Sequence, residues 1–362
     1  MKFEARSMVI KIAMVASLVS ASALAAEGSG QVADQAEAQA HEAWSQTMHQ
    51  ISTPESGCFH ASYPSTQWEK VECAPAPAYR SAVRRPKGSE QIVGNGYDYV
   101  AQVPAGHLLS SALGSFVAAS DVKSEKSVGV PAFGGGGILG PNEYTLQVNT
   151  NFYNSAACDG YSYCLAWQQY VMSTNTPVSL TSDQLTGKTE VFIEYWLINY
   201  GVDNGSDICP AGFIDGGPDG EGPGDDCVQN TPAVVVYKGQ FPITSVADLK
   251  LSGSAAAGGT DKATVTFGAN AYTATVADSY TDISSGWTQA EFNVLGNAGG
   301  SEAVFNSGAA LTVRLVVADG STSAPTCVSP SAYDGTTGET NNLTLGKCTA
   351  VSGATPYIQF IE

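Results

Sequence analysis

Short strand-like runs dominate the sequence after Gly94. They are rich in Val, Ile, Thr, Tyr and Phe and are separated by Gly, Asn, Asp and Pro, which is the pattern of β-strands bounded by turns. No apolar period of 3.6 residues extends over a helical length among them. We predict strands at 97–102, 108–118, 144–152, 165–172, 190–200, 233–238, 247–252, 262–267, 270–276, 290–295, 311–318 and 357–361. So many strands without intervening helices predict an all-β fold, a two-sheet antiparallel β sandwich or jelly roll.

The first 26 residues have the features of a secretory signal peptide. Lys2, Arg6 and Lys11 make a basic start, residues 9–18 are mostly apolar, and Ala23-Leu24-Ala25 fits a small-residue cleavage site. The apolar run is too short to cross a bilayer, and no later run approaches the roughly 20 apolar residues of a membrane helix. We therefore expect a secreted protein, extracellular or periplasmic, without a membrane partner.

Eight cysteines agree with an oxidising compartment. We predict that each pairs with its neighbour in sequence, because each such pair brackets a loop rich in turn-forming residues. A zinc site is the alternative, but the chain has no CxxC and only four histidines. The expected disulfides are Cys58–Cys73, Cys158–Cys164, Cys209–Cys227 and Cys327–Cys348.

The chain before the β region divides into two parts. Residues 27–56 contain an Ala-, Gln- and Glu-rich stretch that favours helix, which we interpret either as a removable pro-segment or as a flexible arm. Residues 57–90 are expected to be a cystine-closed loop and a linker. Within this linker, Arg84-Arg85 is either a processing site or part of a solvated loop. The β-sandwich domain is expected over 91–362.

The charge balance excludes one class of partner. Asp and Glu number 34 against 16 Lys and Arg, which gives a net charge of -18 at pH 7. Nothing here supplies the basic footprint that phosphates require, so we expect no nucleic acid partner.

Several catalytic chemistries are poorly supplied. There is no GxSxG elbow and no HExxH motif, and the cysteines are assigned to bridges. His41, His49 and His60 precede the β region, which leaves only His107 within it. A Ser-His-Asp site or a catalytic zinc with several histidines therefore lacks ligands or bases. If the protein is a hydrolase, its catalytic groups must be carboxylates and carboxamides.

Two predicted strands carry a polar face opposite an apolar one. Side chains alternate along a strand, so Gln147 and Asn149 share one face, and Glu291 shares another with Asn293 and Trp287. An antiparallel sandwich with one wet, concave face would use both strands in this way. We predict that Gln147 and Glu291 meet on that face.

Further residues are predicted to line the same face. Glu194 shares its strand face with apolar neighbours that include Trp196, and Trp167 and Gln169 add aromatic and polar lining. The alternative is that an isolated strand glutamate simply faces water. The residues predicted to contact substrate are Asn149, Trp167, Gln169, Glu194, Trp196, Trp287 and Asn293.

Three segments together resemble the glutamic peptidases of the eqolisin type. They are Leu146-Gln147-Val148-Asn149, Trp167-Gln168-Gln169-Tyr170 and Ala290-Glu291-Phe292-Asn293-Val294, in that order. The family has a catalytic Gln in a Leu-Gln-Thr-Gly strand and a catalytic Glu in an Ala-Glu-Trp strand. Val148-Asn149 stands here in place of Thr-Gly, and Phe292 in place of the Trp. The resemblance implies a concanavalin-like, lectin-like sandwich that is a secreted acid endopeptidase acting on polypeptides.

The resemblance also assigns roles to two residues. Glu291 would be the general base that activates water and later the acid that protonates the leaving amine. Gln147 would donate an amide proton to the developing oxyanion. One alternative is a jelly-roll glycosidase that uses Glu194 and Glu291 on a polysaccharide. The other is a lectin-like binding module or an extracellular structural protein without catalysis.

No cofactor is expected, apart from one candidate calcium loop. Asp215, Asp219, Glu221 and Asp225 lie in a Gly- and Pro-rich stretch and offer the oxygen ligands that calcium takes. The spacing is not that of an EF-hand. The alternative is an exposed acidic loop under the Cys209–Cys227 bridge.

Overall fold

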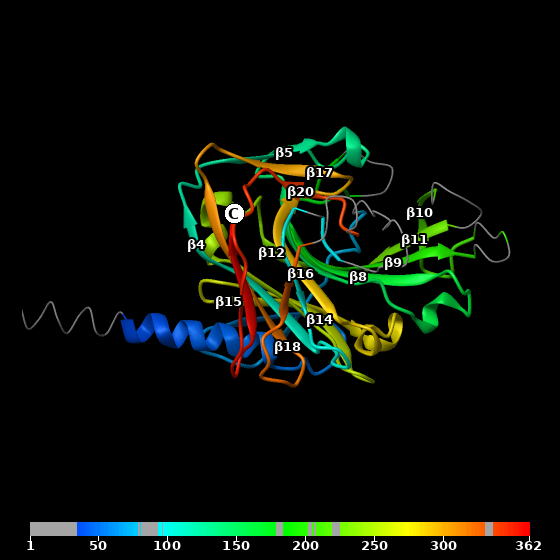
Figure 1. Cartoon of the computed structure of the whole chain (residues 1–362), viewed down its shortest axis with the longest axis horizontal. Coiled ribbons are helices and arrows are strands. Elements are labelled where there is room, and N and C mark those ends of the chain that lie inside the picture. Colours follow the sequence, from blue (N-terminus) through cyan, green and yellow to red (C-terminus); the bar gives the residue numbers. More distant parts are fainter. Residues whose placement is uncertain are drawn as a thin grey trace, which may run out of the picture.

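Two large, mainly antiparallel β-sheets form the body of the protein (Figure 1). The computed structural model describes residues 35–78, 80, 93–95, 97–178, 184–201, 205, 208–218, 225–329 and 336–362. The all-β sandwich expected from the sequence is confirmed. Among the described residues, no helix is long and apolar enough to span a membrane.

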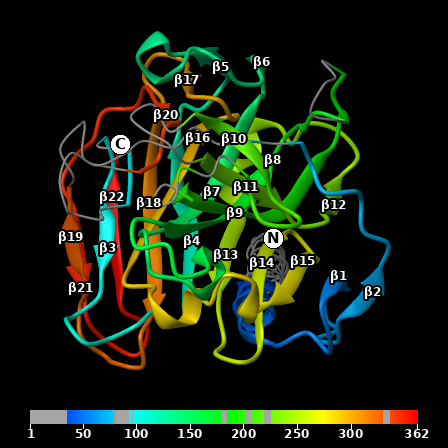
Figure 2. The same cartoon turned by 90° about the vertical axis from the view of Figure 1, so that its right-hand side faces the viewer.

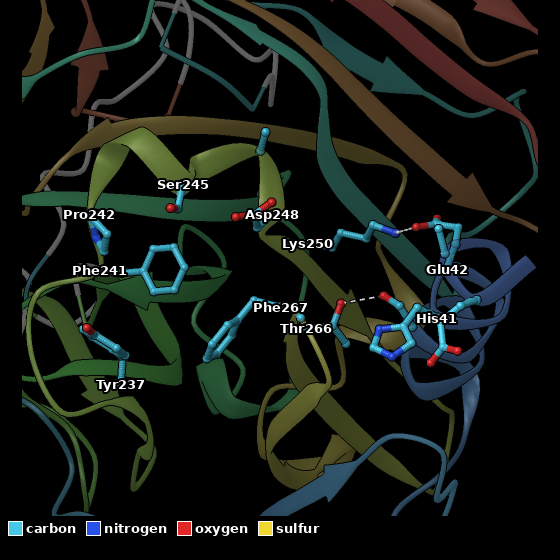
Figure 3. A pocket seen from close by; sticks show the side chains of 15 residues that line it. His41, Glu42, Tyr237, Phe241, Pro242, Ser245, Asp248, Lys250, Thr266 and Phe267 are labelled. Atoms are coloured by element: carbon cyan, nitrogen blue, oxygen red, sulfur yellow. Dashed lines mark hydrogen bonds and ion pairs between the residues drawn. The ribbon is translucent and has the colours of Figure 1, made fainter. Parts of the chain in front are cut away.

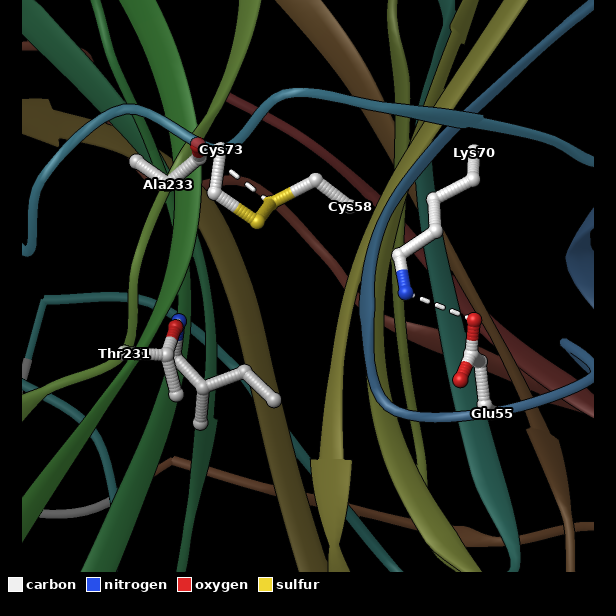
Figure 4. The surroundings of a disulfide bond; sticks show 7 residues. Glu55, Cys58, Lys70, Cys73, Thr231 and Ala233 are labelled. Atoms are coloured by element: carbon white, nitrogen blue, oxygen red, sulfur yellow. Dashed lines mark hydrogen bonds and ion pairs between the residues drawn. A yellow bond between two sulfur atoms is a disulfide. The ribbon is translucent and has the colours of Figure 1, made fainter.

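The first sheet, called sheet I here, has the strand order β2-β1-β15-β14-β13-β4-β18-β22-β21. Its strands are β1 (Gly57–Ser62), β2 (Glu69–Val71), β4 (Ser111–Ser120), β13 (Lys250–Ser254), β14 (Thr260–Phe267), β15 (Asn270–Ala277), β18 (Ala310–Ala318), β21 (Thr349–Val351) and β22 (Tyr357–Ile361). The segment expected as a cystine-closed loop thus contains two strands, and β1 pairs with β15 along its whole length. The Cys58–Cys73 bridge closes this β1–β2 unit (Figure 4).

The second sheet, called sheet II, has the order β10-β11-β9-β8-β7-β16-β3-β19, and β12 also pairs with β9. Its strands are β3 (Val100–Gln102), β7 (Tyr144–Thr150), β8 (Leu165–Ser173), β9 (Thr189–Tyr200), β10 (Ile214–Pro218), β11 (Asp225–Asn230), β12 (Val234–Tyr237), β16 (Gln289–Gly296) and β19 (Thr326–Val328). A small sheet of β5 (Glu125–Gly129), β6 (Gly140–Pro141), β17 (Ser301–Phe305) and β20 (Thr340–Asn341) lies beside them.

The apolar faces of the two sheets pack against each other. Phe292 of β16 packs against Phe116 of β4 in a tilted arrangement, at a ring-centroid distance of 5.2 Å. A Cβ on Gly114 would lie 2.0 Å from the Phe292 ring, so only glycine lets the sheets approach this closely there. The apolar alternate positions of the strands therefore form the core, and the polar alternates of sheet II point to its outer face.

The sequence located most strands correctly and missed others. Each of the twelve predicted runs overlaps a strand of the structure. The Gly- and Pro-rich stretch between Cys209 and Cys227, for which a loop is one of the two interpretations of the sequence, contains strand residues at both ends. β10 and β11 pair there, with Asp215 opposite Cys227, because the bridge and the pairing with β9 impose a strand on turn-rich sequence. All four predicted disulfides are confirmed.

A helix over residues 35–50 packs on the outer face of sheet I (Figure 1). It buries Trp44 and Met48 against Ala61 and Ala271. His49 forms hydrogen bonds through both ring nitrogens, to Ser252 Oγ at 2.7 Å and to a hydroxyl of β14 at 3.1 Å. The expected helix is therefore present, and it lies away from sheet II.

After β2 the chain crosses the outer face of sheet II (Figure 2). Ala74 pairs with Ala233 beside β9, and the carbonyl of Arg80 accepts a hydrogen bond from Gly299, just after β16. Between these points, Asn230 donates to the Pro77 carbonyl at 2.9 Å. The six residues from Ala74 to Arg80 can span at most about 20 Å. The distance across the sheet from β9 to β16 is three strand spacings, about 14 Å. This crossing segment (residues 74–78 and 80) therefore passes over β8 and β7.

Candidate active site

A row of polar side chains crosses the outer face of sheet II. The strand register places Glu291 of β16 opposite Asn149 of β7, Asn149 opposite Gln169 of β8, and Gln169 opposite Glu194 of β9. Residues directly opposite each other in neighbouring strands point to the same side of a sheet. The four side chains therefore form one continuous row across four strands.

Gln147 and Glu291 lie on neighbouring strands, and Asn149 links them. The Asn149 amide nitrogen is 3.0 Å from Gln147 Oε1 and 2.8 Å from Glu291 Oε2. Gln147 faces Asn293 rather than Glu291 in the register, so the two meet diagonally. The predicted pair is thus brought together on one face, with an asparagine between the two groups.

Further hydrogen bonds fix the orientation of both groups. Gln147 Nε2 donates to Thr145 Oγ1 at 3.0 Å, and Gln169 Nε2 donates to Gln147 Oε1 at 3.1 Å. The hydroxyl of Thr337 donates to Glu291 Oε2 at 2.6 Å, and the backbone N–H of Asn95 donates to Glu291 Oε1 at 3.2 Å. The Glu291 carboxylate therefore receives donors from three different segments, as a preorganised base requires.

A second carboxyl group lies near Glu291. Burial first, and then the neighbouring charges of Glu291 and Glu362, raise the pKa of the Asp98 carboxyl well above its ordinary value. Asn293 Nδ2 donates to Asp98 Oδ2 at 3.4 Å and to Glu362 Oε2 at 3.0 Å. Burial also raises the pKa of Glu362 to about 7. Two carboxyl groups, those of Asp98 and Glu362, thus lie at Asn293, near Glu291.

The face is covered by other parts of the chain. Gln147, Asn149, Gln169, Glu194 and Glu291 are all 0% exposed. The expectation of a wet face is therefore wrong, because the crossing segment, residues 93–95 and the buried residues Thr336, Thr337 and Glu339 lie over the sheet. In this form the site is closed.

The predicted aromatic lining is also enclosed. Trp167 and Trp196 pack with Phe152, Ile198 and Val228 at one end of the polar row. Their indole N–H groups donate to the Thr150 carbonyl and to Glu194 Oε1, at 2.7 and 2.8 Å. Both rings therefore lie on the predicted face, packed against protein.

Trp287 does not lie on the face of Glu291. It belongs to the core between the sheets, where its ring is 5.6 Å from that of Tyr170. The alternation fails because residue 287 precedes β16, which begins at Gln289. The predicted position of Trp287 is therefore wrong.

Two participants in the site were not predicted from the sequence. Asp98 precedes β3 and Thr337 lies in a loop before β20, and neither shows a motif. Only the antiparallel register of β3 with β16, in which Val100 lies opposite Glu291, places Asp98 on this face. Such a register depends on tertiary pairing, which a single sequence does not reveal.

The candidate calcium loop is only partly described. Asp219 and Glu221 lie outside the described residues, and Asp215 lies in β10 opposite Cys227. Among the described residues, no group of three His, Cys, Asp or Glu side chains could hold a metal ion. The calcium site stays a prediction from sequence.

An open groove of about 980 Å³ lies elsewhere, between the helix and the 3-10 helix η4 (Ile243–Asp248). Figure 3 shows Phe241 and Phe267 on one side of it, and His41 and the Lys250–Glu42 ion pair on the other. The groove opens beside sheet I, so it gives no access to the polar row.

A comparison with solved structures finds a weak similarity. A solved structure described as the crystal structure of scytalido-glutamic peptidase with a transition state analog inhibitor aligns at 13% identity and a TM-score of 0.24. The alignment covers 79% of this chain and 98% of that one. No family model and no curated protein matches. A TM-score this low does not establish a common fold, so the functional argument rests on the site itself.

Proposed function

We propose that this protein is an exported acid endopeptidase of the glutamic type, with Glu291 as the base and Gln147 as the oxyanion donor. The observation that carries the proposal is the Asn149 amide, which lies 3.0 Å from Gln147 Oε1 and 2.8 Å from Glu291 Oε2. An amide and a carboxylate held this way on adjacent strands can face one substrate carbonyl and one water.

Each group suits its role chemically. Glu291 would take a proton from the attacking water and return it to the leaving amine. An amide nitrogen carries two protons, so Gln147 would present one to the oxyanion while Thr145 holds the other. Four disulfides agree with export.

The closed site implies that this form is latent. Since the polar row is fully buried, a peptide reaches Glu291 only after the crossing segment leaves sheet II. The Arg84-Arg85 processing site proposed from sequence lies outside the described residues. A cut there would separate the crossing segment from Asn95, whose backbone N–H donates to Glu291.

Casein digestion at pH 3–4 with pepstatin present tests the proposal. The full chain should be inactive, and a brief trypsin treatment, with trypsin then inhibited and removed, should release activity. Glu291→Gln should abolish this activity. Glu190→Gln is the matched control, since Glu190 is also buried in sheet II and its carboxylate accepts a hydrogen bond from the Thr176 hydroxyl. Equal activity in the two variants would remove Glu291 from the mechanism.

The geometry disfavours a glycosidase. Glu194 and Glu291 are three strands apart in sheet II, so their backbones are about 14 Å apart, and Asn149 and Gln169 fill the space between them. Glycosidase carboxyl pairs lie about 5–9.5 Å apart. Reducing-sugar release from β-glucans in the trypsin-treated sample would contradict this reasoning, and silence in both assays would favour a binding module.

A further inference from the structure

We propose that the side chains of Gln168 and Thr281 join in an ester cross-link, which the protein forms by itself with loss of ammonia and with Asp261 as the proton carrier. The three residues lie in the core between the two sheets, on the opposite side of sheet II from the polar row. The cross-link does not depend on the proposed peptidase function.

The strand pattern turns Gln168 toward the core. Gln169, the next residue of β8, belongs to the polar row on the outer face, so Gln168 points to the inner side of sheet II. Asp261 belongs to β14 of sheet I, and Thr281 directly follows the 3-10 helix η5 (Asp278–Tyr280), in the connection from β15 to β16. Segments from both sheets therefore meet at one buried amide.

Both ends of the Gln168 amide contact groups that can react with it. The Thr281 hydroxyl donates to Oε1 at 2.9 Å, and Nε2 donates to Asp261 Oδ2 at 3.0 Å. Because a C=O bond is about 1.23 Å long, Thr281 Oγ1 lies no more than about 4.1 Å from the amide carbon. A movement of about 1 Å brings it to the separation of roughly 3–3.5 Å at which reacting atoms meet.

The site is closed to bulk water. Gln168, Thr281 and Asp261 are all 0% exposed. Asp261 Oδ1 has no hydrogen-bond partner among the described residues, which is uncommon for a buried oxygen. Burial raises the pKa of the Asp261 carboxyl to about 8, against the opposing effect of the Gln168 hydrogen bond, so in acid this carboxyl has a proton to donate. Exclusion of water also protects an ester from hydrolysis.

The reaction balances without an added reagent. Thr281 Oγ1 bonds to the amide carbon of Gln168, and the hydroxyl proton passes to Oε1, to which it is already hydrogen-bonded. The Asp261 carboxyl gives its proton to Nε2 as the C–N bond breaks, and it takes the proton from Oε1 as the carbonyl reforms. The products are one ester and one ammonia, and Asp261 returns to its starting state.

The cross-link closes a longer loop than any of the disulfides. Gln168 and Thr281 are 113 residues apart in sequence, whereas the disulfides join residues 6 to 21 positions apart. A covalent link restricts the unfolded chain more as the loop that it closes becomes longer. The ester therefore constrains the β sandwich as a whole, and the disulfides constrain local loops.

Mass spectrometry of the purified chain, reduced and unfolded after overnight incubation, tests the cross-link. Wild type should be lighter than the sum of its residues by one ammonia, about 17 Da. Thr281→Val, which has nearly the same shape but no nucleophile, should keep its full mass, and Thr281→Ser should again lose ammonia. After proteolytic digestion, the wild-type peptides that contain positions 168 and 281 should remain joined. Separate peptides of unmodified mass would overturn the proposal.

Mild alkali identifies the bond. It should separate the joined wild-type peptides and leave a carboxyl group at position 168, and a link that resists alkali would not be an ester.

Asp261→Asn tests the proton carrier. It should keep its full mass under the same incubation, with the fold checked by circular dichroism, because the carboxyl that protonates the leaving nitrogen is gone. Complete cross-linking in this variant would remove Asp261 from the reaction. Asp261→Ser, which is smaller and also lacks the carboxyl, gives the same test with the same two outcomes where Asn disturbs folding.

Discussion

The two covered faces of the sandwich bury opposite kinds of polar groups. On sheet I, the helix over 35–50 places His49 against the hydroxyls of Ser252 and Thr266. On sheet II, the crossing segment and its neighbours cover Asp98, Glu291 and, at the edge, Glu362. On sheet I, an imidazole is hydrogen-bonded to two neutral hydroxyl groups. On sheet II, several carboxylic acids are buried close together. The difference is that the helix interface joins neutral partners, whereas the covered site holds acids whose ionisation burial opposes.

The two faces should also respond to pH in opposite directions. Burial, and then the charges of Lys250 and Lys262, lower the pKa of His49 to about 3. Burial raises the pKa of Asp98 well above its ordinary value and that of Glu362 to about 7. Acid therefore weakens the helix interface, and base weakens the covered site.

The largest expected effect is a loss of global stability as the pH rises. The carboxyl groups with raised pKa values include Asp98, Glu362, Glu125 at about 8 and Asp261 at about 8. Their contribution is fully present below the unfolded values near pH 4 and is lost as the pH rises to the folded values. The free energy of unfolding in urea should fall by at least about 3 kcal/mol between pH 5 and pH 8. A flat profile would contradict the burial of protonated acids.

The next effect concerns the helix interface and has the opposite sign. A lowered pKa at His49 gives stability that is present above its unfolded value, about 6.5, and is lost as the pH falls toward about 3. The change is on the order of 4 kcal/mol at most. Hydrogen exchange of the helix amides, corrected for the intrinsic rate, should accelerate between pH 6 and pH 4 in wild type. His49→Gln should remove this pH dependence, and its persistence would assign the effect to another group.

A smaller effect compares two adjacent threonines of the covering loop. Thr337 donates to Glu291 at 2.6 Å, whereas the buried Thr336 hydroxyl has no hydrogen-bond partner among the described residues. Thr337→Val should cost about 1.5–3 kcal/mol, because a buried hydrogen bond to a carboxylate is lost. Thr336→Val, the matched control, should be near neutral. Equal costs in urea unfolding at pH 5 would show that the contact with Glu291 contributes nothing specific.

The smallest effect is expected at the rim of the helix. Glu42 pairs with Lys250 at a partly exposed position, and such pairs contribute roughly 0–1 kcal/mol. Glu42→Gln should lower the free energy of unfolding by less than about 1 kcal/mol, and the difference should shrink in 1 M salt. A larger loss that resists salt would mean that this ion pair anchors the helix.

The sequence predicted which side chains share one face of a strand better than it predicted which strands lie next to each other. Alternation alone placed Gln147, Asn149, Glu291 and Asn293 correctly, because each lies well inside its strand. It failed at Trp287, just outside β16, and gave no sign of Asp98, whose place depends on how β3 aligns with β16.

The covering of the site was also invisible in the sequence. The Pro-rich residues 74–78 have the composition of a linker, and nothing local shows that a linker will lie against Val171 and Phe192. These contacts join segments far apart in the sequence, and the residue of the crossing segment that makes them is the small Ala74, so no local pattern marks them.

The crossing segment has one consequence for the chain after processing. All four disulfides close loops of 6 to 21 residues, and none joins the part before Arg84-Arg85 to the part after it. A cut at that dipeptide would therefore give two polypeptides with no covalent link, while β1 stays paired with β15. The smaller polypeptide would then be held only by noncovalent contacts such as the β1–β15 pairing, so that dilution after cleavage would determine when it leaves sheet II.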